Sequence, residues 1–205
     1  MSDIAVFLGP SLPLAVAQTA LDATYLPPIK RGDLSRLSPE IRLIGIVDGE
    51  FYQSLAVSPK EILPLLEHGV KVYGASSMGA LRAVELESCG MIGVGRIFEA
   101  YRDGAVDAED EVALVYEPET CRPLSEPLIN IRFALEQAVG RGLLASARAE
   151  EVVETIRKKW FPRRSYADVA RLCPELAGMF AAGLPNQKAD DALLMLRTMR
   201  RDRTA

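Results

Sequence analysis

The sequence predicts an α/β fold, in which a mostly parallel sheet with helices is followed by a helical C-terminal part. Short apolar runs alternate with amphipathic helical stretches until about residue 120, and beyond Pro118 only helical periodicity continues. At 205 residues and 49% hydrophobic composition, the chain is long enough to bury one sizeable core. We therefore expect an α/β core over residues 1–120 and a helical subdomain over residues 121–205. The alternative is that both pack as one domain.

The first strand and helix are predicted at the N-terminus. Asp3–Gly9 is a β-rich apolar run that ends at Gly9-Pro10, and Ser11 is placed to cap a helix over residues 12–22. Thr24–Ile29 is a second extended segment, made rigid by two prolines.

The third strand is followed by an acidic residue. Arg42–Val47 is almost wholly apolar, as expected of a strand covered on both faces, and Asp48 comes directly after it. Parallel sheets bind ligands at the carboxyl ends of their strands, so Asp48 is either a turn former or a site residue.

The next helix carries a clear start signal. Ser58, Pro59 and Glu61 form a capping-box pattern, so a helix should run from there to about Glu67. Pro64 lies inside it and predicts a kink or two short helical pieces.

The remaining elements follow in the same alternation. The pattern predicts strands over Val70–Gly74 and Glu111–Glu117, and helices over Ser77–Ser88 and Gly95–Arg102. The C-terminal part has four amphipathic helical runs, Leu128–Val139, Ala147–Trp160, Tyr166–Cys173 and Ala189–Met199.

Composition excludes several classes of function. A net charge of -4 argues against nucleic-acid binding, and three isolated cysteines without metal-ligand spacing indicate reduced thiols and no metal site. The N-terminal segment has no basic region and reaches Gly9-Pro10 after few apolar residues, so we expect a cytoplasmic protein without a membrane span. No cofactor motif is recognised.

The segment Val70–Leu86 is the most informative stretch, because a strand runs through small residues into a helix that begins at two serines. Ala75-Ser76-Ser77-Met78-Gly79 resembles a nucleophile elbow with alanine at the first glycine position. A serine at this place lies among unpaired N–H groups that can hold an oxyanion. From pattern alone, either Ser76 or Ser77 is the candidate, and a simple helix cap is the commoner role.

A lysine is the expected base, because the chain has one histidine, His68, which fits a helix end. Setting aside the lysines of the C-terminal part leaves Lys30, Lys60 and Lys71. Lys60 lies in the first turn of a helix, where the dipole favours the neutral amine that a base requires. Two arginines, Arg31 and Arg82, are candidates for clamping a carboxylate or thiocarboxylate.

Several segments are informative when taken together in their order along the chain. They are FLGPSLP (Phe7–Pro13), PPIKRGDL (Pro27–Leu34), IVDGEF (Ile46–Phe51), SPKEIL (Ser58–Leu63), VYGASSMGALRAVEL (Val72–Leu86), GMIGVGRIFEAYRDG (Gly90–Gly104) and DEVAL (Asp110–Leu114). Over roughly residues 3–117, these segments resemble the TfuA-like core family.

The resemblance implies a partner of YcaO enzymes in peptide-backbone thioamidation. Such a protein would release sulfide from the thiocarboxylate of a ThiS-like, ubiquitin-fold sulfur carrier with a Ser-Lys pair, and would help YcaO engage its precursor peptide. Matched to the family pattern, Ser77 is the nucleophile and Lys60 the preferred base, with Lys30 second.

Other residues are expected to support such a Ser-Lys site. N–H groups near Met78 and in the loop Gly9–Ser11 would hold the oxyanion, and the remaining binding or support positions are Arg31, Asp33, Asp48, Ser76, Gly79 and Arg82.

Two other classes of function remain open. One is a non-catalytic adaptor that docks on YcaO and recruits the peptide or the sulfur carrier. The other is a small-molecule or phosphate-binding α/β protein, although the chain lacks the P-loop lysine and the dinucleotide glycine pattern.

Overall fold

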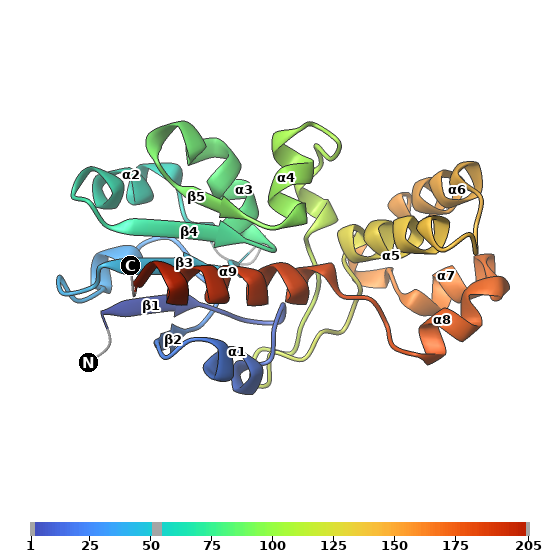
Figure 1. The fold of residues 1–205 in the computed structure, drawn as a ribbon, viewed down its shortest axis with the longest axis horizontal. Helices are drawn as coiled ribbons and strands as arrows, with labels where there is room; N and C mark the ends of the chain where they lie inside the picture. The colour runs from blue at the N-terminus through green and yellow to red at the C-terminus, as the bar shows by residue number, and fades with distance from the viewer. Residues whose placement is uncertain (1–2, 51–54, 204–205) are drawn as a thin grey trace. The chain divides into compact units, whose positions relative to one another are not determined.

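A computed structural model describes residues 3–50 and 55–203 of the chain, and it confirms the predicted α/β fold (Figure 1). Its centre is a five-stranded sheet in the order β2-β1-β3-β4-β5, and every neighbouring pair is parallel. The strands are β1 (Ile4–Phe7), β2 (Thr24–Leu26), β3 (Leu43–Ile46), β4 (Lys71–Ala75) and β5 (Ile92–Val94). Phe51, the last residue of the IVDGEF segment, lies outside the described residues.

Helices cover both faces of this sheet. On one face α1 (Leu14–Ala20) and α9 (Gln187–Arg203) pack against the side chains of Ile4, Val6 and Tyr73. The other face carries α2 (Pro59–Glu67), α3 (Met78–Leu86) and α4 (Arg96–Arg102), as Figure 1 shows. Alternating residues of the same strands therefore enter two different cores, which explains why the strands are apolar throughout.

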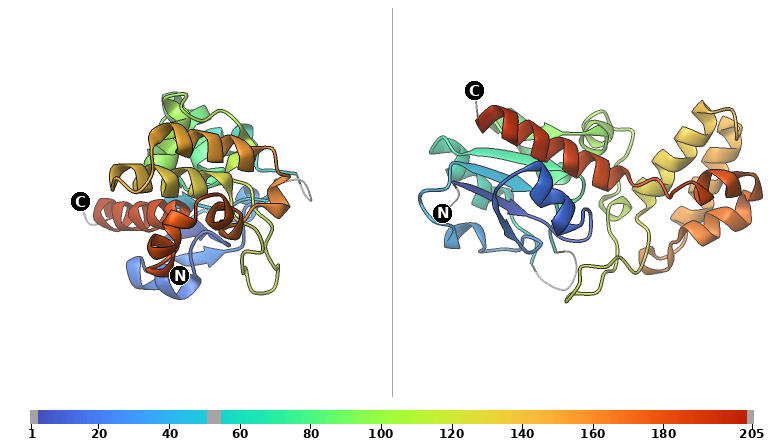
Figure 2. Two further views of the ribbon diagram at one scale, coloured as in Figure 1. Left: turned by 90° about the vertical axis from the view of Figure 1, so that its right-hand side faces the viewer. Right: turned by 60° about the horizontal axis from the view of Figure 1, so that its bottom comes forward.

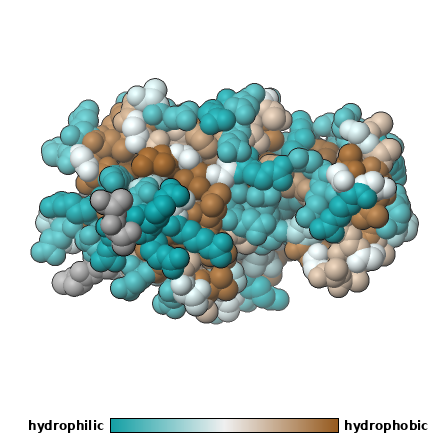
Figure 3. Space-filling model, in the orientation of Figure 1, coloured by the Kyte–Doolittle hydropathy of each residue, from teal (hydrophilic) through white to brown (hydrophobic). Residues whose placement is uncertain are grey.

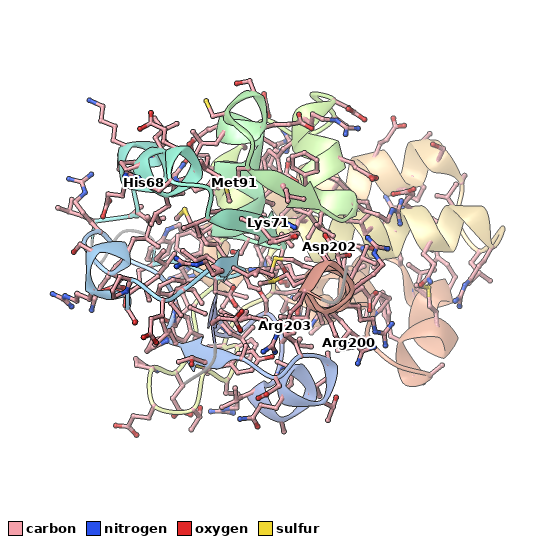
Figure 4. The ribbon with its side chains drawn as sticks, turned by 60° about the vertical axis from the view of Figure 1, so that its left-hand side comes forward. His68, Lys71, Met91, Arg200, Asp202 and Arg203 are labelled. Carbon is pink, nitrogen blue, oxygen red and sulfur yellow. The ribbon has the colours of Figure 1, made fainter. Side chains whose placement is uncertain are left out.

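The helix α9 runs against the direction of the strands. It begins at the carboxyl ends of the strands, where the carbonyl of Lys188 accepts a hydrogen bond from Ser76, and near its other end Asp202 accepts one from Tyr73 at 2.9 Å. Figure 4 shows Asp202 beside Lys71, the first residue of β4. The apolar face of α9 packs against the sheet and is fully buried; it consists of Ala192, Met195, Leu196 and Met199.

The chain divides into two compact units. The divisions fall after Asp107 and after Gln187, and not at residue 120 as expected. Unit 1 comprises Met1–Asp107 together with Lys188–Ala205, and unit 2 comprises Ala108–Gln187. The last helix thus returns to the α/β unit, because its buried stripe completes one face of the sheet.

Unit 2 is helical and has a core of its own. Its main helices are α5 (Leu128–Gly140), α6 (Ser146–Arg157), α7 (Tyr166–Leu172) and α8 (Ala177–Ala181), drawn from yellow to orange in Figure 2. Short 3-10 turns join them or flank the sheet: η1 (Leu34–Arg36), η2 (Glu87–Cys89), η3 (Glu109–Glu111), η4 (Phe161–Arg163) and η5 (Pro174–Leu176).

The strand predicted over Glu111–Glu117 is wrong. The segment begins in a 3-10 turn, and the fully buried Glu111 accepts hydrogen bonds from Arg132 and Arg157. These ion pairs hold the segment against the helices of unit 2. The fifth strand of the sheet is instead β5, a three-residue run that contains a glycine and gave no strand pattern.

Of two expected helix caps, one is present and the other is not. The capping box is confirmed, since the Ser58 N–H donates to Glu61 at 2.9 Å, and α2 is one helical span despite Pro64. Ser11 does not cap α1, because the helix starts only at Leu14, with Pro13 at the N-cap position; the Ser11 hydroxyl donates to Asp48 instead.

Hydrophilic and hydrophobic residues are interspersed over the face seen in Figure 3. In the described part of the chain, none of the helices is both long enough and apolar enough to cross a membrane.

Candidate active site

Polar side chains from three strand ends meet at the carboxyl edge of the sheet. The strand order reverses direction between β1 and β3, and open α/β sheets bind ligands in the crevice at such a point. The loop Gly9–Ser11 follows β1, Asp48 follows β3, and Ser76 and Ser77 follow β4. The sequence had placed all of these residues among the site candidates.

Asp48 is fixed by the loop after β1. Its Oδ2 accepts the backbone N–H groups of Gly9 at 2.9 Å and of Ser11 at 3.1 Å, and its Oδ1 accepts the Ser11 hydroxyl at 2.6 Å. Asp48 and Ser11 are both 2% exposed. Because the carboxylate takes three donors, its charge is stabilised without water.

Ser77 is presented by a tight turn at the end of β4. The Ser77 N–H donates to the carbonyl of Ala75 at 2.7 Å, and Ser76 between them has a φ of 72°. This is the geometry of a γ-turn with a left-handed central residue, a conformation that costs of order 1–3 kcal/mol in a residue other than glycine. The turn places Ser77 at the start of α3, as its N-cap residue.

A close approach of α3 to the sheet explains the glycine after Ser77-Met78. A Cβ on Gly79 would lie 1.7 Å from the carbonyl oxygen of Ile46, so α3 begins directly over β3. Only glycine permits this approach, which brings the N-terminus of α3 close to Asp48.

The lysine beside Ser77 is Lys188, at the start of α9. Its Nζ lies 3.1 Å from Ser77 Oγ and 4.0 Å from Asp48 Oδ1. Lys188 is 2% exposed and Ser77 3% exposed, so both atoms meet away from bulk water. The Ser76 hydroxyl donates to the backbone carbonyl of Lys188 and thereby fixes the main chain of the lysine as well.

A second contact anchors the first turn of α9. Asp191 accepts the backbone N–H of Arg96 at 3.2 Å and that of Ile97 at 2.8 Å, at the start of α4. Gly95 has a φ of 97° and lies against the Asp191 side chain, where a Cβ would lie 2.3 Å from Asp191 Cγ. Lys188 is therefore held by its own contacts and by those of the turn that follows it.

The structure does not bring Lys60 to Ser77. Lys60 is exposed in the first turn of α2, and its side chain makes no hydrogen bond or ion pair within residues 3–50 and 55–203. Lys30, the second choice, is exposed as well, and Lys71 begins β4 at the opposite end of the strand from Ser77. His68, labelled in Figure 4, ends α2 and donates from Nδ1 to the carbonyl of Pro64 at 2.5 Å.

Three further candidates have structural partners or lie exposed. Arg82 donates from Nε to the carbonyl of Val57 at 2.8 Å and from Nη1 to Glu85 at 2.6 Å, so these groups already have acceptors. Asp33 accepts the backbone N–H of Lys30 at 3.0 Å within its turn, and Arg31 is exposed.

The expected oxyanion donors separate into two groups. The N–H groups of Gly9 and Ser11 donate to Asp48, so the loop after β1 orients that carboxylate instead of an oxyanion. The Met78 N–H lies at the first position of α3 and has no hydrogen-bond acceptor in the described part of the chain. The Met78 N–H could therefore donate to the oxyanion of an acyl group bonded to Ser77.

Sequence reasoning missed Lys188 because 111 positions separate it from Ser77. A signal was present: α9 carries a stripe of Ala192, Met195, Leu196 and Met199, at helical spacing, that needs a large apolar partner surface. If that stripe is assumed to pack on the sheet, the first turn of the helix, which contains Lys188, lies near one end of the strands.

Within the described residues, no cluster of three histidine, cysteine or acidic side chains could hold a metal ion. No curated protein matches the chain. The TfuA-like protein family matches residues 48–165, more than half of the 205 residues, and the matched span contains Asp48 and Ser77 but ends before Lys188. By this match, the chain belongs to the TfuA-like protein family.

Proposed function

We propose that this protein releases sulfide from a thiocarboxylated, ThiS-like sulfur carrier and acts with a YcaO enzyme in peptide-backbone thioamidation. The observation that supports the chemistry is the 3.1 Å separation of Lys188 Nζ and Ser77 Oγ at a buried strand end. The family supports the substrate and the partner, whose roles come with the resemblance of the N-terminal segments to TfuA-like proteins.

Lys188 takes the place that we expected Lys60 to have. A base must accept the serine proton, so Lys188 must be neutral when Ser77 attacks. Its burial favours the neutral amine, whereas Asp48 at 4.0 Å favours the charged form. The three hydrogen bonds that Asp48 receives from Gly9 and Ser11 hold its carboxylate on the loop, so that Lys188 Nζ lies 4.0 Å from Oδ1, beyond hydrogen-bond distance.

The reaction has two halves. Lys188 accepts the hydroxyl proton, Ser77 Oγ bonds to the thiocarboxylate carbon, and the Met78 N–H stabilises the oxyanion. The carbon–sulfur bond then breaks, and the proton from Lys188 passes to the sulfur, which leaves as hydrosulfide. In the second half Lys188 accepts a proton from water, which attacks the acyl-serine. Lys188 returns this proton to Ser77 Oγ as the ester bond breaks, and the carrier leaves as a carboxylate, whose own proton goes to solvent.

The burial of Ser77 restricts the substrate. A side chain that is 3% exposed is reached by a slender group and not by a folded surface, which suits the extended C-terminal tail of a ubiquitin-fold protein. The same burial favours one alternative, an adaptor in which Ser77, Lys188 and Asp48 only hold a strand–helix junction that docks on YcaO.

Three variants test the proposal. Ser77→Ala and Lys188→Met should each lower sulfide release from a thiocarboxylated carrier by about a thousandfold or more, because nucleophile and base act as one unit. Lys60→Met is the matched control and should retain normal release, since Lys60 is exposed in α2. Sulfide is measured directly, and folding is checked by circular dichroism.

The outcomes separate the two candidates. Full sulfide release by folded Ser77→Ala, or loss of release in Lys60→Met, contradicts the Ser77–Lys188 pair. If Ser77→Ala still binds YcaO and stimulates thioamidation from free sulfide but releases none from the carrier, the hydrolytic and docking roles coexist. Stimulation that needs neither the carrier nor Ser77 favours the adaptor alone.

A further inference from the structure

A basic and aromatic surface lies in unit 2, outside the candidate active site. We call it the Trp160 surface and define it as Lys158, Trp160 and Arg163, in the loop between α6 and α7. Trp160 is the single tryptophan of the chain, and it is 66% exposed. A ring this large normally buries most of its area, so an indole exposed to this degree is unusual.

The loop that presents Trp160 is rigidly held. Arg164 is 2% exposed and donates to the carbonyls of Lys159 at 3.1 Å, Asp110 at 3.1 Å and Arg157 at 3.2 Å, and to the Asp110 carboxylate at 2.7 Å. The Trp160 ring packs edge-to-face against Phe161, with centroids 6.1 Å apart. A surface held in this way loses little conformational freedom when it binds.

The charge of the loop is positive, although the whole chain carries -4. Of its four cations, Lys159 pairs with Asp168 at 2.6 Å and Arg164 with Asp110 at 2.7 Å. The side chains of Lys158 and Arg163 are exposed and form neither hydrogen bonds nor ion pairs within the described residues. Two unpaired positive charges therefore flank the exposed indole.

We propose that the Trp160 surface is a docking site for an acidic polypeptide segment that carries an apolar side chain. The apolar side chain packs on the indole, and the acidic residues meet Lys158 and Arg163 at the rim, the arrangement by which an aromatic anchor and charge complementarity select a partner. This site does not depend on the chemistry proposed for Ser77.

An anionic membrane is a less suitable occupant. A helix that lies on a membrane inserts a continuous apolar face, but the apolar face of α6 is buried in the core of unit 2. The residues of that face are Ala149, Val152, Val153 and Ile156. One indole beside a half-buried phenylalanine leaves too little apolar area for insertion.

The test uses the full chain and the emission of its single tryptophan. The probe is a short fluorescein-labelled peptide, free of tryptophan, in which pairs of glutamates alternate with leucines. Binding is measured by anisotropy, and unlabelled peptide is added to observe Trp160. We expect saturable binding and a blue shift of the emission, because leucine side chains cover the indole.

Matched variants locate the site. Lys158→Glu and Arg163→Glu should each raise Kd about fivefold, and Trp160→Ala about tenfold or more. Arg141→Glu carries the same charge change at another exposed arginine of unit 2 and should leave Kd unchanged. A peptide with glycines in place of the leucines should bind at least about fivefold more weakly, and one with lysines in place of the glutamates should not bind.

The proposal is overturned if the peptide causes no blue shift, or if neither Lys158→Glu nor Arg163→Glu changes the affinity. It is also overturned if Arg141→Glu raises Kd as much as those two variants do, or if the glycine peptide binds as tightly as the leucine peptide. A blue shift with phosphatidylglycerol vesicles but not with the peptide would instead assign the surface to membranes. Sulfide release by Trp160→Ala is expected to equal that of the unchanged protein, so a failure of either proposal is distinguishable from a failure of the other.

Discussion

At the scale of single residues, the carboxylate of Asp48 accepts three hydrogen bonds in the candidate site. It joins the loop after β1 to the region of Lys188, with three donors from Gly9 and Ser11 and an ammonium or amine group 4.0 Å away. All of these groups are buried, so none of them can exchange its partner for water. A small change in Asp48 should therefore affect both stability and the geometry around Lys188.

Asp48→Asn tests this role. The amide keeps one oxygen acceptor, but its NH2 group then faces donors of the loop and leaves at least one of them unpaired in a buried place. We expect the free energy of unfolding to fall by about 1–3 kcal/mol in urea titrations, and sulfide release to fall more than binding of the carrier does.

Asp33→Asn is the control, since Asp33 accepts one backbone N–H in a partly exposed turn. Its stability should stay within about 0.5 kcal/mol of the unchanged protein. If Asp48→Asn is as stable and as active as the control, the three hydrogen bonds do not define the site.

At the scale of elements, two physical effects on Gly79 oppose each other. Helix propensity favours alanine over glycine by about 1 kcal/mol in a helix interior. In α3, however, the added Cβ would lie 1.7 Å from the Ile46 carbonyl oxygen, and backbone cannot move aside as a flexible side chain can. Overpacking of this kind costs about 1–3 kcal/mol or more, so the clash should dominate.

Gly79→Ala should therefore destabilise the protein by about 2 kcal/mol or more in urea unfolding, and it should separate Ser77 from Lys188. Gly140→Ala is the matched control at the end of α5, where a Cβ meets nothing within 4 Å, and it should be neutral or slightly stabilising. A Gly79→Ala protein as stable as Gly140→Ala would show that α3 does not approach the sheet this closely.

Elements with strong local patterns were predictable from the sequence. The strands β1, β3 and β4 are apolar runs with polar ends, and the capping box of α2 depends only on Ser58 and Glu61. The strand β5 was not predictable, because a three-residue segment centred on Gly93 is too short to show an alternating hydrophobic pattern. The strand predicted at Glu111–Glu117 failed because buried ion pairs to Arg132 and Arg157 outweighed its β propensity.

The candidate site was predictable in the parts that lie close to strand ends. Gly9, Ser11, Asp48 and Ser77 each follow a recognisable strand, and parallel strands bring their ends together. The lysine beside Ser77 was not predictable in this way, because its position depends on how a helix from the far end of the chain packs on the sheet. The helix dipole and the resemblance to the family favoured Lys60, whereas tertiary packing places Lys188 beside Ser77.

At the scale of the whole molecule, one buried and one partly buried tyrosine link stability to alkaline pH. Burial and a hydrogen bond to Asp202 raise the pKa of Tyr73, and burial together with Asp22 raises the pKa of Tyr25 to about 12. Above the ordinary tyrosine pKa of about 10, the unfolded chain loses these protons while the folded chain keeps them. Folding stability should therefore be complete below pH 10 and fall as the pH rises beyond it.

Tyr73→Phe should make this fall shallower, because one of the linked protons is gone. The measurement is the free energy of unfolding at several values between pH 9 and pH 11.5 in both proteins. At neutral pH the variant should lose about 1 kcal/mol, the value of one hydrogen bond from Tyr73 to Asp202. Parallel curves for the two proteins would contradict a raised pKa for Tyr73.

The two units should differ in their dependence on α9. Unit 1 is discontinuous in sequence, and its core includes Met195, Leu196 and Met199 of α9, each 0% exposed. Burial of one such side chain contributes about 1.5–3 kcal/mol, so the three together match the 5–15 kcal/mol by which a domain is typically stable. Unit 2 is one continuous segment with a separate core, which does not include α9.

A chain that ends at Gln187 should therefore lose the fold of unit 1 and keep that of unit 2. In hydrogen exchange read by mass spectrometry, we expect the amides of β1, β3 and β4 to lose protection while those of α5 and α6 keep it. Two substitutions in the full chain grade the effect: Leu196→Ala should cost about 2–5 kcal/mol, and Leu194→Ala, at a side chain 49% exposed, less than about 1 kcal/mol. Protected strands in the shortened chain would mean that α9 supplies Lys188 to the site but is not needed to hold the sheet.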